Sequence, residues 1–112
     1  MYVRIARFEG GTTDDIVAEA EDIRRGIVAA GRGEQDLYFP KKLTERVRRM
    51  ELVVDRGSGS VAVLLYCDSR DDAREVDRIM NGMSPQRGGW GKRVSSDLYE
   101  VVVDEVTGVP TT

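Results

Sequence analysis

The sequence predicts an α+β domain in which a four-stranded antiparallel sheet carries two helices on one face. Two segments have apolar residues at helical spacing, and four segments have the composition of strands. They follow one another in the order β-α-β-β-α-β, which arranges strands and helices in two layers. The chain has 112 residues, the common size of one domain. We expect residues 1–106 to form this domain and residues 107–112 to be a flexible tail.

The first strand and the first helix are predicted near the start of the chain. Residues 3–8 have strand composition and are followed by the pair Gly10-Gly11. A helix is expected to begin at Thr12 or Thr13, because a threonine oxygen can accept from free amide groups at a helix start. Gly31 and Gly33 are expected to end this helix. Its apolar positions recur at helical spacing, namely Ile16, Val17, Ala20, Ile23, Ile27 and Val28.

A β-hairpin is the clearest local prediction in the middle of the chain. Residues 35–45 are irregular and are predicted as a loop or a short helical turn. Residues 47–55 and 60–67 are predicted as two strands, and the Gly- and Ser-rich residues 56–59 as the tight turn that joins them.

The second helix and the last strand are predicted after the hairpin. Ser69, followed by Asp71 and Asp72, is a typical helix start. The apolar side of this helix comprises Ala73, Val76, Ile79, Met80 and Met83. Residues 84–92 are predicted as a loop, and the last strand is expected within residues 94–106, most securely over residues 98–103.

This order of elements is the ferredoxin-like arrangement, with both helices on one face of the sheet. The strands nevertheless have apolar residues on both faces, whereas a sheet with one solvated face alternates apolar with polar residues. Residues 60–67 place Val61, Val63 and Leu65 on one side and Ala62, Leu64 and Tyr66 on the other; the last strand is expected to place Leu98 and Val102 against Tyr99, Val101 and Val103. We therefore expect a second copy of the sheet to cover the face without helices.

The predicted hairpin resembles a known family. Its turn Asp55-Arg56-Gly57-Ser58-Gly59 is similar to the Asp-Arg-x-(Ser/Thr)-Gly turn of the antibiotic biosynthesis monooxygenase-like branch of the dimeric α/β-barrel superfamily. Residues 3–7 and 67–69 resemble other segments of that branch. The resemblance implies a homodimer with two sheets packed face to face and a cavity between each sheet and its helices. Its members include cofactor-independent oxygenases of polyphenolic substrates, haem-degrading enzymes and proteins without known activity. The Asp55-Arg56 pair itself is expected to shape the turn.

Composition disfavours several function classes. The net charge of −3 and the pI near 5.0 disfavour a nucleic-acid partner, and Tyr66 is the only aromatic residue on the strand that would stack RNA bases. Histidine is absent, which removes the common ligand of metals and haem, so we expect no cofactor. Cys67 is the only cysteine, which indicates a cytoplasmic protein. The longest apolar run, residues 61–67, is too short to span a bilayer, so we expect no membrane partner.

Four residues are candidates for lining a ligand pocket, and each has a structural alternative. Trp90 and Tyr66 would contact an aromatic ring, Asn81 would donate or accept a hydrogen bond, and Arg4 would stabilise negative charge. Alternatively, Trp90 plugs one end of the fold, Tyr66 belongs to the core or the dimer interface, Asn81 ends a helix, and Arg4 faces solvent or an ion pair. The Gly-rich residues 87–92 precede a strand and not a helix, which disfavours phosphate binding.

Two functional hypotheses remain open on the sequence. The first is a homodimer that binds, or oxidises, a small hydrophobic or aromatic molecule without metal or flavin. The alternative is a non-catalytic ligand-binding, regulatory or assembly module. A cavity with convergent polar groups favours the first, and a cavity filled by side chains favours the second.

Overall fold

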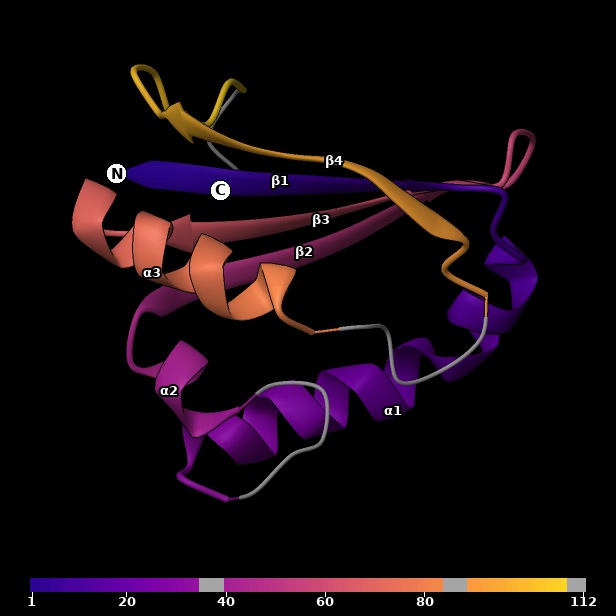
Figure 1. The fold of residues 1–112 in the computed structure, drawn as a ribbon, viewed down its shortest axis with the longest axis horizontal. Helices are drawn as coiled ribbons and strands as arrows, with labels where there is room; N and C mark the ends of the chain where they lie inside the picture. The colour runs from indigo at the N-terminus through magenta and orange to yellow at the C-terminus, as the bar shows by residue number, and fades with distance from the viewer. Residues whose placement is uncertain (35–39, 84–88, 109–112) are drawn as a thin grey trace.

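The computed structural model describes residues 1–34, 40–83 and 89–108. Four strands form one sheet in the order β2-β3-β1-β4, and every neighbouring pair is antiparallel. The three helices of the described residues all lie on one side of this sheet (Figure 1), an arrangement compatible with a ferredoxin-like fold. The elements are β1 (Tyr2–Glu9), α1 (Thr13–Gly31), α2 (Lys41–Thr44), β2 (Val47–Asp55), β3 (Ser60–Cys67), α3 (Arg70–Asn81) and β4 (Lys92–Glu100).

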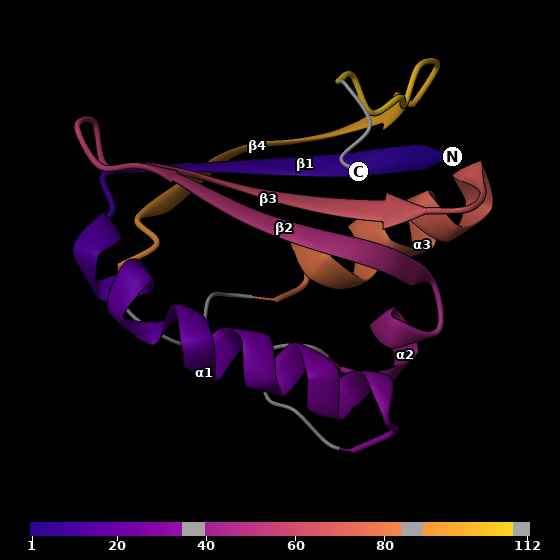
Figure 2. The ribbon, with the colours of Figure 1, turned by 180° about the vertical axis from the view of Figure 1, so that it is seen from behind.

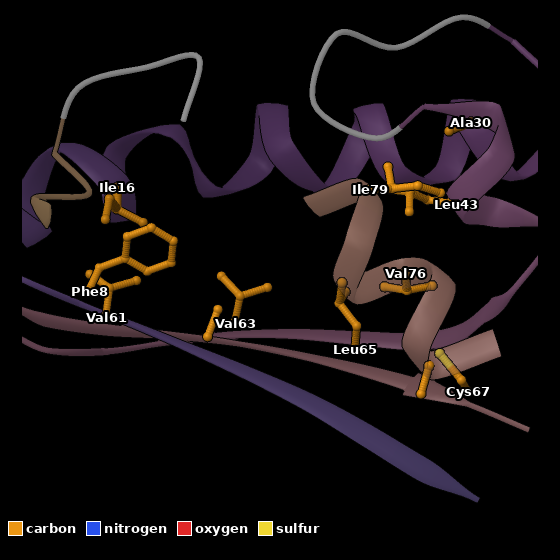
Figure 3. Packing of buried hydrophobic residues seen from close by; sticks show 12 residues of the cluster. Phe8, Ile16, Ala30, Leu43, Val61, Val63, Leu65, Cys67, Val76 and Ile79 are labelled. Carbon is orange, nitrogen blue, oxygen red and sulfur yellow. The ribbon is translucent and has the colours of Figure 1, made fainter. Parts of the chain in front are cut away.

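The core lies between the sheet and the helices. Alternate residues of β3 point to the helices and are buried, namely Val61, Val63, Leu65 and Cys67. Figure 3 shows Val61 beside Phe8 and Ile16 at one end of the sheet and Leu65 near Val76 toward the other end. Val63 lies between Val61 and Leu65, and Leu43 lies beside Ile79 in the helix layer. The predicted hairpin is confirmed with its bounds, because this alternation matches the two-residue period of a strand.

The two predicted helices are present, but only one has the expected cap. Ser69 precedes α3, and its side-chain oxygen accepts a hydrogen bond from the backbone N–H of Asp72 at 3.1 Å. Thr12 precedes α1 without such a bond, so the predicted threonine cap is wrong. The backbone N–H of Asp15 is instead satisfied by the carbonyl of Thr12 at 3.0 Å.

The last strand lies earlier in the chain than the sequence indicates. β4 ends at Glu100, so the prediction that residues 101–103 belong to the strand is wrong. The reason is the topology: β4 pairs with β1, and Glu100 is opposite Tyr2 at the start of β1. One further bond joins the N–H of Val101 to the carbonyl of Met1 at 2.9 Å. The valines that follow Val101 lie past the start of β1 and therefore have no strand beside them to pair with.

The irregular stretch at residues 35–45 contains α2, so the short helical turn is confirmed in its second half. Residues 35–39 of that stretch, 84–88 of the Gly-rich loop and 109–112 of the predicted tail lie outside the described residues. The described end of the Gly-rich loop runs directly into β4, as expected.

Candidate functional site

One face of the sheet carries no helix in the part of the chain that the structure describes. Figure 2 shows the sheet from behind with the helices still on one side of it. We call the other side the open face. Strand registers place on it Arg49, Glu51 and Val53 of β2, Ala62, Leu64 and Tyr66 of β3, Val3, Ile5 and Arg7 of β1, and Ser95, Asp97 and Tyr99 of β4. Its centre consists of the apolar residues Val3, Ile5 and Leu64, of which Val3 is already buried in the single chain and the other two are half-buried.

A hollow of about 350 Å³ lies near the hairpin end of the open face. Register explains it: Ala62 of the middle strand is opposite Arg7 on one side and Val53 on the other. Two larger side chains therefore flank a small one, and Ser60, the next open-face residue of β3, is small as well. The hollow has an apolar wall at Val53, which is 49% exposed, and a cationic wall at Arg7.

Charges around the hollow differ in how they are engaged. Asp55 belongs to its lining, but the carboxylate accepts a hydrogen bond from the backbone N–H of Gly57 at 3.0 Å. Hydrogen bonds from Ser58 and from that backbone group lower the pKa of Asp55, so its charge serves the turn. Arg7 forms no ion pair with any described residue. Its guanidinium is available to an acidic group in the hollow.

The hairpin turn that borders the hollow is held by a close approach of two backbones. The N–H of Gly11 donates to the carbonyl of Gly59 at 3.1 Å. Gly59 has φ +75°, and a Cβ atom there would lie 2.8 Å from the Gly11 carbonyl oxygen. Only glycine fits this position without movement of the backbone.

Two of the four predicted pocket residues, Arg4 and Asn81, contact each other on the helix side of the sheet. Arg4 is 1% exposed; its Nε donates to Asp77 Oδ1 at 2.8 Å and its Nη2 to Asn81 Oδ1 at 2.9 Å. Ser96 Oγ also donates to Asn81 Oδ1, at 3.2 Å. Burial lowers the pKa of Arg4, and the hydrogen bond and charge of Asp77 oppose that shift. The cluster is satisfied by its own members and fastens α3 to β1 and β4.

The Asn81 end of α3 is fastened by a second arginine. Arg93 of β4 donates from Nη1 to the carbonyl of Met80 and from Nη2 to that of Asn81, both at 3.1 Å. Both carbonyls belong to the last turn of α3, and the Met80 carbonyl also accepts from the backbone N–H of Met83 at 3.0 Å. The alternative interpretation of Asn81 as a helix C-terminal residue is therefore confirmed, and the residue also contributes to the Arg4 cluster.

Tyr66 and Trp90 lie apart from that cluster and from each other. Tyr66 is on the open face, where its hydroxyl donates to Glu51 Oε1 at 2.8 Å and Arg49 lies 6.0 Å from its ring. The hydrogen bond with Glu51 raises the pKa of Tyr66. Trp90 packs edge-on against Phe8, with 5.4 Å between ring centroids, on the helix side. The structure thus brings Arg4 and Asn81 together and does not bring Tyr66 or Trp90 to them.

The residues that line the hollow were not among the sequence candidates. No sequence motif includes Arg7, Val53 or Ala62, and the alternation along each strand indicates only the sheet face on which each residue lies. Their row across three strands depends on the register, which was not predicted. The signal that could indicate a hollow is a small residue on a middle strand, such as Ala62, opposite larger residues on both neighbouring strands.

Cys67 and the acidic residues show no reactive or metal-binding arrangement in the described residues. The Cys67 thiol is buried, and burial, followed by the charges of Asp72 and Asp68, raises its pKa from 9.0 to about 11. A thiol in such surroundings is inert at neutral pH. Within residues 1–34, 40–83 and 89–108, no three side chains of His, Cys, Asp or Glu are grouped to hold a metal ion.

Comparisons with models of protein families, with curated proteins and with solved structures found no match. The structure itself shows a small α+β domain with a four-stranded antiparallel sheet. Among the described helices, none has both the length and the apolar character needed to cross a bilayer.

Proposed function

We propose that the chain forms a homodimer through its open face and binds a small aromatic molecule with an acidic group in the hollow at Ala62. The observation that carries this proposal is the open face itself, which has an apolar centre and no covering helix in the described chain. Large apolar sheet faces are rarely left in water by monomeric proteins. The sheet-to-sheet homodimer is also the arrangement implied by the resemblance of the hairpin to the dimeric α/β-barrel superfamily.

The hollow supports the ligand class. Its volume of about 350 Å³ is at the lower end of the usual range for small-molecule sites, which suits one or two fused rings. Val53 and Ala62 would contact the ring, and Arg7 would pair with the acidic group. A second copy over the open face would exclude water from the hollow and strengthen both contacts. This hollow is on the opposite side of the sheet from the cavity that the family resemblance implies.

Binding is favoured over oxidation because the polar candidates do not converge. On the helix side, Arg4 and Asn81 form hydrogen bonds with each other and with Asp77 and Ser96. On the open face, the hydroxyl of Tyr66 is bonded to Glu51. An oxygenase that acts on a phenolate needs a ring site and a group that stabilises negative charge at the same place. In the hollow, Arg7 alone has that role, and the described lining offers no base to take a phenol proton except carboxylates at its rim.

Light scattering across a dilution series tests the homodimer. We expect a constant mass of twice the 12.5 kDa chain. Leu64→Glu places a carboxylate at the centre of the open face, where water reaches it only in the monomer. This variant should remain folded by circular dichroism and become monomeric. Ala18→Glu, on the exposed side of α1, is the control and should stay dimeric. A wild-type monomer at all concentrations would overturn the homodimer.

Backbone amide chemical shifts in a titration with 2-naphthoate test the ligand site. The largest shifts are expected at Arg7, Val53 and Ala62, and naphthalene-2-methanol should bind about 3- to 10-fold more weakly because it lacks the charge. Arg7→Met should remove this difference, whereas Arg56→Met, in the neighbouring turn, should keep it. Ala62→Leu fills the hollow and should abolish binding. Shifts confined to the helix side of the sheet would contradict the proposed site.

A further inference from the structure

The lining of the hollow at Ala62 has two neighbouring rows of side chains with opposite charge. One row contains Arg7. The next row toward the hairpin turn is here called the acidic row, and it consists of Glu9, Ser60 and Asp55, all of which line the hollow. Asp55 is opposite Ser60 in the β2–β3 register, and the β1–β3 register, continued by one residue, places Glu9 on the other side of Ser60. Figure 2 shows the β2–β3 turn at the same end of the sheet as the end of β1. A serine therefore lies between two carboxylates.

The carboxylates of the acidic row are not neutralised by an ion pair within the described part of the chain. Hydrogen bonds in the turn lower the pKa of Asp55, which keeps that group charged. Glu9 is exposed and, like Asp55, forms no ion pair with a described residue. Lys92 of β4 is opposite Glu9 on the side away from the hollow and does not line it. Both negative charges are thus available to a ligand.

The charges of the lining decide between ligand classes. Its ionisable residues are Arg7, Glu9 and Asp55, one positive and two negative. A plain aromatic acid pairs with Arg7, but leaves the two carboxylates without a counter-charge about 7 Å away, two residues along the strands. A plain aromatic amine pairs with the acidic row and leaves Arg7 unpaired. Exclusion of water by a second copy makes each unpaired charge more costly. A ligand with both an acidic and an ammonium group matches both rows.

The acidic row also has the acceptors that an ammonium group needs. Such a group has three N–H donors, and the row offers two carboxylates and one hydroxyl. The Ser60 Oγ accepts a hydrogen bond from Ser58 Oγ at 2.9 Å, which leaves it a second lone pair. Neighbouring strands are about 5 Å apart, so Glu9 and Asp55 flank the same space over Ser60. An ammonium group in that space can be bonded from three sides.

We propose that the hollow binds an aromatic amino acid in its zwitterionic form. The carboxylate of the ligand pairs with Arg7, its ammonium group lies in the acidic row, and its ring packs against Val53 and Ala62. This inference rests on the proposed ligand site in the hollow and adds a second charged subsite to it. The two rows are neighbours on the sheet, as the two charged groups are neighbours in an amino acid.

Three compounds with the same ring separate the contributions of the two charges. L-phenylalanine has both charged groups, 3-phenylpropanoate lacks the amine, and 2-phenylethylamine lacks the carboxylate. Backbone amide shifts at pH 7 give the dissociation constant of each compound. L-phenylalanine should bind about 2- to 5-fold more tightly than either of the others, the range expected for one additional partly exposed ion pair. The shifts that only the two amines produce are expected at Glu9 and Ser60.

Two variants assign the subsites. Glu9→Gln should remove the preference for L-phenylalanine over 3-phenylpropanoate, whereas Glu100→Gln, an exposed carboxylate at the end of β4, should keep it. Arg7→Met should remove the preference for L-phenylalanine over 2-phenylethylamine. Circular dichroism checks that each variant remains folded.

Two results would overturn the amino-acid ligand while the proposed site stands. In the first, 2-naphthoate shifts the amides of the hollow, but 3-phenylpropanoate binds there as tightly as L-phenylalanine. In the second, the preference for L-phenylalanine is present and survives Glu9→Gln. If neither 2-naphthoate nor any of the three compounds shifts the amides of the hollow, the proposed ligand site is refuted together with the inference.

Discussion

The Arg4–Asp77 pair should respond very differently to the loss of each partner. Arg4 is 1% exposed, whereas the side chain of Asp77 is 28% exposed. Removing one member of a buried ion pair costs about 3–5 kcal/mol, because the remaining charge is left without compensation in the interior. Water can solvate the remaining charge only if that side chain is exposed. The cost therefore depends on which partner remains and not only on the pair that is lost.

Asp77→Ala leaves the buried guanidinium of Arg4 with Asn81 Oδ1 as its described acceptor, and should cost about 3–5 kcal/mol of unfolding free energy. Arg4→Met keeps an apolar stem of similar length and leaves a carboxylate that water reaches, so about 1–2 kcal/mol is expected. The double variant has no buried charge at this place. Its unfolding free energy should therefore be no lower than that of Arg4→Met and higher than that of Asp77→Ala.

Urea unfolding followed by far-ultraviolet circular dichroism measures these differences, with the slope against urea expected to stay constant across the set. Arg24→Met provides a matched control, since Arg24 pairs with Glu21 on the exposed side of α1 and its loss should leave the midpoint unchanged. Equal destabilisation by the two single variants, or a larger effect of Arg4→Met, would refute the argument from exposure.

Three further predictions concern the core, the helix starts and the buried thiol. Ser69→Ala should cost about 0.5–2 kcal/mol of unfolding free energy because it removes a cap bond, whereas Thr12→Ala, where the side chain makes no cap bond, should cost less; equal effects in urea unfolding would contradict this. Val63→Glu should unfold the chain, because it places an unpaired charge in the core on the helix side, whereas Val101→Glu, past the end of β4, should leave a folded chain by circular dichroism. Cys67, with its pKa near 11, should react with a thiol reagent at pH 8 at least about 100-fold more slowly in the native protein than in denaturant, and rapid labelling of the native protein would show an accessible thiol. Because the thiol of the unfolded chain ionises first, its contribution to the unfolding free energy should be fully present below pH 9.0 and should fall as the pH rises to about 11.

The sequence predicts the fold where a local pattern and the topology agree. In the β2–β3 hairpin, the two-residue alternation and the Gly-rich turn specify the same structure, and the predicted bounds of both strands match. At the end of β4 they disagree. Strand propensity is highest at Val101–Val103, but a strand needs a neighbour, and β1 supplies none beyond Tyr2. Strand propensity is a local property and strand pairing is not, so the sequence places the end of β4 later than Glu100.

The candidate site shows the same limit. The pairing of Arg4 with Asn81 joins residues 77 positions apart, and it follows from α3 crossing behind β1, which no local pattern records. The sequence pattern places Tyr66 on the correct strand, but only the register shows that Glu51 is within reach of its hydroxyl. Arg7, Val53 and Ala62 form a row across three strands, and each is unremarkable in its own segment.

The open face combines an apolar centre with charges near its edges, and this combination restricts how two copies can pack. Arg49 and Glu51 lie on the β2 side and Asp97 on the β4 side, while Val3, Ile5 and Leu64 lie between them. Apolar contact alone would accept many rotations of one sheet on the other, because the hydrophobic effect has no direction. Charges at the rim exclude rotations that bring like charges together. Each copy carries a net charge of −3, so a dimer formed in this way should associate faster as added salt screens the repulsion between the two chains, while its dissociation rate, set by the apolar centre, should change little.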